Sequence, residues 1–147
     1  MASTVTARAP AWVDGIGVSG AEMRAAIEGA RWFNAGISRG LGVTQIPTPA
    51  MQIRVAAGLC QVSDGQNGYL PLELAAQTDL DIAASSPTLP RIDSLIAEFV
   101  DNGASSIYRF RVITGTPAGS PSAPSLPPAD QPTGKTLRLY NIAVAAN

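Results

Sequence analysis

Residues 89–127 decide the fold of this chain and read LPRIDSLIAEFVDNGASSIYRFRVITGTPAGSPSAPSLP. From residue 92 to 100, and again from 107 to 113, apolar and polar side chains alternate with a period of two, which is typical of β-strands. Asp101, Asn102 and Gly103 lie between the two runs, and these residue types tolerate a positive φ. The pattern predicts an antiparallel hairpin at the centre of the sheet. One face of its first strand carries Asp93, Leu95, Ala97 and Phe99, and the other carries Ile92, Ser94, Ile96, Glu98 and Val100.

Five further segments have strand-like patterns, and they are residues 51–55, 59–63, 69–74, 78–83 and 135–145. We expect Ala56 to Gly58 to turn the chain so that the second segment returns along the first. The third and fourth form another pair, with the third at a sheet edge because Pro71 has no backbone N–H to donate. In the last segment, simple alternation predicts one face made of Thr136, Arg138, Tyr140, Ile142 and Val144. About seven short strands separated by turns predict a mainly β fold, with an antiparallel β-sandwich-like module or a small barrel.

One helix is predicted, ahead of the strands. Ser19 and Glu22 have the spacing of a capping box, in which each side chain binds the backbone N–H of the other residue. An apolar stripe follows at helical spacing and ends before Gly36, which is a natural helix stop. Residues 37–50 are expected to form a connector. The chain therefore divides into an N-terminal arm with an amphipathic helix, residues 1–45, and an antiparallel β domain with a proline-rich arm at 116–132, residues 46–147.

The bulk composition limits the classes of partner. The chain has 147 residues, a net charge of −1, 46% hydrophobic residues and 14% charged residues. This charge gives no electrostatic reason to expect binding to nucleic acid or to an anionic membrane. No apolar run approaches the ~20 residues that span a bilayer, so membrane insertion is not expected. Residues 1–11 lack the continuous apolar segment of a signal peptide, which predicts synthesis in the cytoplasm.

The chemistry of a catalytic or cofactor site is poorly represented. Histidine is absent, which removes the commonest general base and the commonest transition-metal ligand. Residues 15–20 spell G-x-G-x-x-G, but no buried strand precedes them and no acidic residue follows at the spacing of a dinucleotide site. Cys60 is interpreted as a buried thiol. Asp79 and Asp81 are interpreted as part of a solvated strand face. Arg109 and Arg111 are interpreted as the wet side of a strand or as partners for acids across a subunit boundary. We therefore predict no enzyme activity, no catalytic residue, no cofactor and no metal site.

Other features favour assembly with further subunits. Residues 116–132 carry six prolines and are expected to run as extended chain over the surface or over a neighbour. Extended arms give a large contact area per residue, and proline lowers the entropy lost on docking. The alternative is a monomer whose arms fold back on it. The predicted subunit-interface residues are Trp12, Met23, Ile27, Phe33, Pro117, Pro121, Pro124 and Leu126.

The order of several motifs resembles one family. Pro90-Arg91-Ile92-Asp93, followed by a strand, by Thr114-Gly115-Thr116-Pro117-Ala118 and by Ser120-Pro121-Ser122-Ala123-Pro124, is similar to a segment of minor tail and upper-baseplate proteins. These belong to siphophages that infect high-GC Gram-positive bacteria, and the resemblance covers roughly residues 43 to 145. It implies a virion structural protein of the tail tip, a homo-oligomer and possible trimer, that binds other tail or baseplate proteins and links the tail to adsorption proteins.

Three other functions remain open at this point. A capsid decoration or head-fibre base protein would suit a chain of this length nearly as well. A carbohydrate-binding module would need a shallow patch of exposed aromatic side chains, for which Trp12, Trp32, Tyr69, Tyr108 and Tyr140 are the candidates. A hydrolase without histidine would need carboxylates that converge in a cleft.

Overall fold

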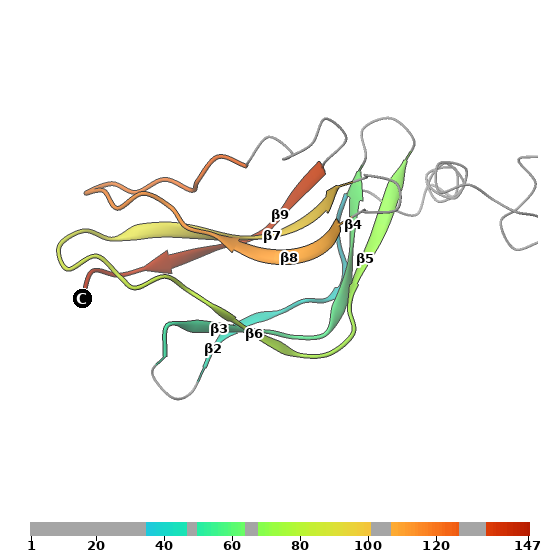
Figure 1. The fold of residues 1–147 in the computed structure, drawn as a ribbon, viewed down its shortest axis with the longest axis horizontal. Coiled ribbons are helices and arrows are strands. Elements are labelled where there is room, and N and C mark those ends of the chain that lie inside the picture. The colour runs from blue at the N-terminus through green and yellow to red at the C-terminus, as the bar shows by residue number, and fades with distance from the viewer. Residues whose placement is uncertain (1–34, 47–49, 64–67, 101–106, 127–134) are drawn as a thin grey trace, which may run out of the picture.

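The computed structural model describes residues 35–46, 50–63, 68–100, 107–126 and 135–147. The described residues are mainly β and form nine strands (Figure 1). In chain order these are β1 (Gly36–Gly40), β2 (Val43–Gln45), β3 (Gln52–Val55), β4 (Gly58–Ser63), β5 (Tyr69–Leu74), β6 (Thr78–Asp81), β7 (Arg91–Val100), β8 (Ile107–Ile113) and β9 (Lys135–Val144). The predicted helix after Ser19 lies outside the described residues.

The strands form three antiparallel sheets of three strands each within the described part of the chain. Sheet A has the order β1-β4-β5, sheet B the order β2-β3-β6, and sheet C the order β8-β7-β9. Figure 1 shows sheet C on one side of the molecule, with sheet B opposite it and sheet A closing one end.

Sheets A and B are two halves of one bent ribbon. Each of the segments 36–45, 52–63 and 69–81 contributes one strand to each sheet. The middle segment keeps the same two neighbours on both sides of the bend, because β3 pairs with β2 and β6 while β4 pairs with β1 and β5. Two backbone hydrogen bonds at the bend, from the amide of Leu41 to the carbonyl of Ala57 and from the amide of Ala56 to the carbonyl of Gly42, keep the ribbon continuous.

Unusual backbone geometry makes this corner possible. Gly40 and Leu41 have φ angles of 62° and 57°. A Cβ atom at Gly40 would lie 2.1 Å from the carbonyl oxygen of Ala57, so this position requires glycine. Leu41 adopts a left-handed backbone conformation, which costs a non-glycine residue roughly 1–2 kcal/mol. Its side chain is fully buried in the core, which offsets that cost.

The hairpin predicted from residues 92–113 is confirmed. β7 and β8 pair antiparallel from Ser94 opposite Ile113 to Val100 opposite Ile107. β7 is the central strand of sheet C, and β8 is an edge strand. β9 pairs with the other side of β7, so the predicted last strand is confirmed as well.

Four expectations are wrong, and two of them concern which strands pair. β3 and β4 belong to different sheets, and so do β5 and β6, because Ala56 and Ala57 and residues 75–77 form a corner rather than a tight turn. The expected connector at 37–50 contains β1 and β2, two short edge strands with few apolar residues. In β9 the register shifts by one residue at Leu139, which has no opposite residue on β7. Because each such bulge inverts the alternation, Thr136 and Arg138 share one face while Tyr140, Ile142 and Val144 share the other. The edge position predicted for Pro71 is confirmed, since β5 is an edge strand of sheet A.

One hydrophobic core joins the three sheets. Its buried members come from every sheet and are Leu41, Ile53, Val55, Cys60, Val62, Leu72, Ile82, Leu95, Ala97, Phe99 and Val144. β7 contributes the face that carries Leu95, Ala97 and Phe99, as its alternation predicts. The opposite face of β7 points away from this core and forms part of the candidate site.

Candidate functional site

A buried ion pair lies at the start of β7, where the chain enters sheet C. Nε of Arg91 donates to Oδ1 of Asp93 at 2.9 Å, and Nη2 donates to Oδ2 at 3.2 Å. Arg91 is 4% exposed and Asp93 is 0% exposed. The two residues are two positions apart on one strand, so both side chains lie on the core face of β7. A charge buried there is tolerated only when it is paired and hydrogen-bonded.

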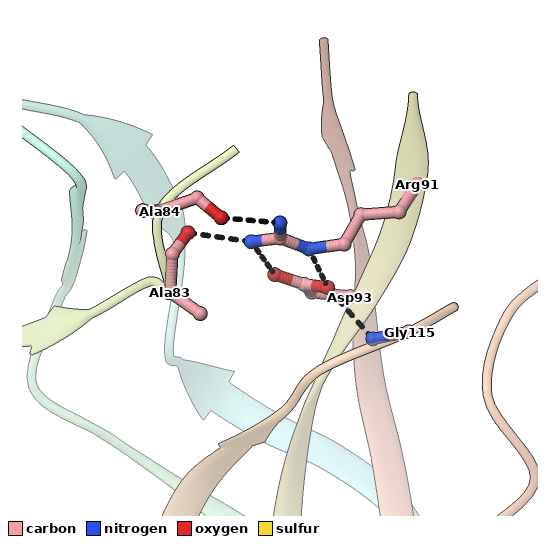
Figure 2. A network of polar contacts seen from close by, with 5 residues as sticks. All are labelled: Ala83, Ala84, Arg91, Asp93 and Gly115. Atoms are coloured by element: carbon pink, nitrogen blue, oxygen red, sulfur yellow. Dashed lines mark hydrogen bonds and ion pairs between the residues drawn. The ribbon is translucent and has the colours of Figure 1, made fainter. Parts of the chain in front are cut away.

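The remaining donors of Arg91 bind the connection between β6 and β7. Nη1 donates to the carbonyl oxygen of Ala84 at 2.7 Å, and Nη2 donates to that of Ala83 at 2.5 Å (Figure 2). The guanidinium therefore holds the connecting segment against sheet C. Both partners are backbone atoms, so any residue type at positions 83 and 84 could supply them.

Asp93 also fixes the start of the proline-rich arm. Its Oδ1 accepts a hydrogen bond of 2.8 Å from the backbone amide of Gly115, which follows the end of β8 (Figure 2). Gly115 lies so close to β7 that a Cβ atom there would sit 2.0 Å from the carbonyl oxygen of Ile92. We call Arg91, Asp93 and Gly115, with the carbonyls of Ala83 and Ala84, the arm lock. It joins three segments that are separate in sequence.

Beyond the arm lock, the described part of the arm lies along its own domain. The amide of Ala118 donates to the carbonyl of Pro90 at 3.0 Å, and Nη2 of Arg138 on β9 donates to the carbonyl of Pro124. Figure 1 shows the arm, in orange, running along the face of sheet C that points away from sheet B. Residues 116–126 thus form an extended layer over sheet C.

Ile96 lies under this second layer. It is fully buried but does not belong to the core that joins the three sheets. Its neighbours across β8 and β9 are Arg111 and Arg138. The long stems of such arginines cover apolar surface while their charged ends reach outward, and Arg138 carries the contact with the arm. β7 is consequently buried on both faces.

A charged cluster occupies the next row of the same face. Glu98 is 0% exposed, and its Oε2 accepts from Nε of Arg109 at 2.5 Å and from Nε of Arg111 at 3.0 Å. Nη2 of Arg111 also donates to Oε1 at 3.1 Å. Burial acts to raise the pKa of Glu98, but the hydrogen bonds and charges of the two arginines outweigh burial, and the pKa lies below its ordinary value. The acid that pairs with Arg109 and Arg111 is therefore on the same chain, whereas the sequence left it open whether they face water or a second subunit.

Two grooves open where sheet C meets the bent ribbon. Groove 1 has a volume of about 360 Å³ and lies between β5, β6 and β8, with Tyr108, which is 60% exposed, on its rim. Groove 2 is larger, at about 620 Å³, and lies between β2, β3 and residues 140–147. Among the described residues that line groove 2 there is no aspartate, glutamate, lysine or arginine. Both grooves offer contact surface rather than converging acids.

The structure places the candidate chemical groups as follows. Cys60 is buried, and burial raises the pKa of its thiol to about 11, so the nucleophilic thiolate is scarce at neutral pH. Asp79 and Asp81 lie on an exposed strand, as predicted. Asp79 forms two hydrogen bonds with Arg54, which lower the pKa of the carboxyl, and Asp81 accepts one from Gln52. Within the residues that the structure describes, no three His, Cys, Asp or Glu side chains are grouped closely enough to hold a metal ion.

The predicted interface residues fall into three groups. Trp12, Met23, Ile27 and Phe33 lie outside the described residues, as does the G-x-G-x-x-G segment at 15–20. Pro121 and Pro124 are half-buried against their own domain, while Pro117 and Leu126 are exposed. Their role in contacts between subunits stays a prediction.

Sequence reasoning missed the role of Arg91 and Asp93. The pattern placed Asp93 on the same face as Leu95 and Phe99, and a carboxylate on an apolar face needs a partner. That is the signal that could have revealed the arm lock, with Arg91 two residues away as the nearest cation.

Comparison with protein-family models, with curated proteins and with solved structures gives no match to this chain. The described part contains no helix that is long and apolar enough to cross a membrane.

Proposed function

We propose that this chain is a structural protein of a phage virion, a minor tail or baseplate component at the tail tip. It joins subunits and links the tail to adsorption proteins, has no catalytic activity of its own, and is made in the host cytoplasm. In this proposal an N-terminal helix precedes a sandwich-like β module. The chain acts as a homo-oligomer, and its other partners are tail or baseplate proteins.

The observation that supports the proposal most is the arm lock. The resemblance to tail proteins depends on Arg91 and Asp93 in one motif and on Gly115 in another, more than twenty positions away in the sequence. In the fold, Asp93 binds both Arg91 and the backbone amide of Gly115. The motifs therefore belong to one structural device, which is what a shared module predicts and a chance similarity of short segments does not.

The available surface also suits assembly. Sheet C and the bent ribbon leave two grooves along strand edges, and the arm presents Pro117 and Leu126 outward. A subunit that binds neighbours along extended edges and arms needs such surfaces. By contrast, Tyr108 is exposed whereas Tyr69 and Tyr140 are only partly so, and one exposed tyrosine among the described aromatic residues makes a poor sugar platform.

The decisive experiment is location in the particle. Virions that contain this chain are separated into tails and heads, and each fraction is digested and analysed by mass spectrometry. We expect its peptides in the tail fraction at a constant ratio to the other tail-tip proteins. Detection in heads alone would replace the proposal with the capsid decoration or head-fibre base function, and absence from both fractions would refute it.

A further inference from the structure

The edges of the three sheets differ in how they are protected. A sheet edge exposes unpaired backbone N–H and C=O groups, and proteins block unwanted pairing there with charged side chains, proline or bulges. Most edges in the described part of the chain carry such residues. They are Arg39 on β1, Pro71 and Glu73 on β5, Asp79 and Asp81 on β6, Arg109 and Arg111 on β8, and Lys135 and Arg138 in the first half of β9.

Two edges lack this protection, and both border groove 2. β2 consists of Val43, Thr44 and Gln45, and the second half of β9 runs from Tyr140 to Val144. Neither contains a charged residue or a proline. Within the described residues, β9 pairs with β7 alone and β2 pairs with β3 alone. The two uncharged edges thus border a groove of about 620 Å³ whose described lining has no charged side chain.

The second half of β9 is complementary to itself. When two copies of a strand pair antiparallel about a two-fold axis at Ile142, each Ile142 faces the other, Tyr140 faces Val144, and Asn141 faces Ala143. An aromatic residue opposite a β-branched one is a favourable cross-strand pair, as for Tyr140 and Val144. Isoleucine is itself a residue type that is common in strands. In this register Arg138 lies opposite Ala146, so the register does not bring the two copies of Arg138 opposite each other.

The groove provides room for the added strand. Tyr140, Ile142 and Val144 lie on the core face of β9, and each of them lines groove 2. A strand added at the edge of sheet C in the two-fold arrangement places its own Tyr140, Ile142 and Val144 on the same face of the extended sheet, beside those that line groove 2. Backbone pairing at the edge and apolar contact in the groove then occur together.

We propose that the second half of β9 is a dimer interface, where a second copy of this chain adds antiparallel about a two-fold axis at Ile142 and makes sheet C continuous across both copies. This inference rests on the homo-oligomer part of the proposed function and names its contact surface. It is independent of where in the virion the protein lies, since it concerns the purified chain.

The first test measures the mass of the full chain in solution by light scattering after size exclusion, at micromolar concentration. The expected mass is twice 15.1 kDa. Ala143→Lys adds a charge to the exposed edge and is expected to give the monomer mass at the same concentration. Ala75→Lys, the same change at an exposed position of the corner, is the matched control and should stay dimeric. Thermal unfolding of both variants shows that each is folded.

The second test fixes the register with two single-cysteine additions. Residues directly opposite on antiparallel strands have Cα atoms about 4.5–5.5 Å apart, within the range that a disulfide spans. Asn141→Cys mixed with Ala143→Cys is therefore expected to form a disulfide-linked dimer under mild oxidation. Each variant alone is not, since diagonal neighbours are about 7–8 Å apart. Asn141 accepts a hydrogen bond of 3.0 Å from Ser94, so the folding of Asn141→Cys is measured alongside.

A monomeric or trimeric wild-type chain would overturn the inference. So would a dimer that Ala143→Lys leaves intact, or one in which the mixed variants form no disulfide, because its interface would then lie elsewhere. Each of these outcomes leaves the tail location to its own experiment, and a tail location without this dimer would separate the two proposals.

Discussion

Removing the carboxylate of Asp93 is the sharpest test of the arm lock. In Asp93→Ala, Arg91 keeps its charge at 4% exposure and loses both of its ion-pair contacts, and the amide of Gly115 loses its acceptor. Breaking a buried pair by removing one partner costs about 3–5 kcal/mol. Since the whole stability of a domain is about 5–15 kcal/mol, the change should remove a large part of it.

The chain offers a matched control for this experiment. Asp79 and Arg54 form the same two-point contact, at 2.8 Å and 2.9 Å, but on an exposed strand where water screens the charges. Asp79→Ala is therefore expected to have a much smaller effect. Urea unfolding at neutral pH, followed by circular dichroism, measures both. With a slope of about 2 kcal/mol per molar urea, the midpoint of Asp93→Ala should fall by roughly 1.5–2.5 M.

A third variant separates the cost of the uncompensated charge from that of lost contacts. Arg91→Met combined with Asp93→Asn removes both charges and keeps an oxygen that can accept from Gly115. It should recover part of the stability lost in Asp93→Ala, because no unpaired charge remains buried. Equal losses in Asp93→Ala and Asp79→Ala would refute the reasoning, since burial would then make no difference to the pair.

Three further outcomes are expected, two from substitutions and one from labelling of the unchanged chain. Gly115→Ala should lower the free energy of unfolding by about 1–3 kcal/mol and make the arm more sensitive to proteolysis, because the new Cβ would lie 2.0 Å from the backbone oxygen of Ile92. Gly119→Ala is the control and should be tolerated, since no atom lies within 4 Å of its new Cβ. The pKa of Glu98 is lowered in the folded state, so its ionised form contributes to stability in full above the unfolded-state pKa of about 4.3. This contribution is lost as the pH falls through the folded-state pKa. Melting temperatures measured against pH should therefore depend less on acid for Glu98→Gln than for the wild type. Cys60 should resist a thiol reagent at pH 8 in the folded protein and react after unfolding in urea; rapid reaction in the folded protein would contradict its burial.

The sequence predicts the long strands well and the short ones poorly. β7, β8 and β9 have seven to ten residues each, with enough alternation to be recognised. β1 and β2 have five and three residues and mostly exposed side chains, because they are edge strands with one neighbour. A short exposed strand has little apolar pattern to distinguish it from a connector.

The corner explains why two strand pairings were predicted wrongly although the strands themselves were predicted correctly. Ala56 and Ala57 separate two strand-like runs, and a pair of small residues is equally compatible with a tight turn and with a bend. The positive φ angles lie in the neighbouring segment, at Gly40 and Leu41. Nothing local to residues 52–63 therefore reports that the chain continues into a second sheet, since the corner is made by contacts between segments.

The arm lock was only half visible for a similar reason. Arg91, Asp93 and Gly115 stand out in the sequence, but two of the acceptors that complete the lock are the carbonyls of Ala83 and Ala84. Backbone atoms leave no residue-type signal. In contrast, the pairing of Glu98 with Arg109 follows from the hairpin register, which places the two residues directly opposite.

The resemblance to tail proteins depends on residues that stabilise the fold, so it says more about the fold than about the binding partner. The residues that create the resemblance are engaged inside the molecule, where they fix the arm and the connection before β7. A relative that kept them would share the path of the arm whatever its surface binds. Under the proposed function, the choice of partner therefore depends on residues that the lock leaves available, above all the uncharged edge from Tyr140 to Val144. Asp93→Ala should consequently weaken folding and assembly together, whereas Ala143→Lys should weaken assembly alone. If both variants changed stability and association in the same proportion, the arm lock and the contact surface would not be separate parts of the structure, and this reasoning would be wrong.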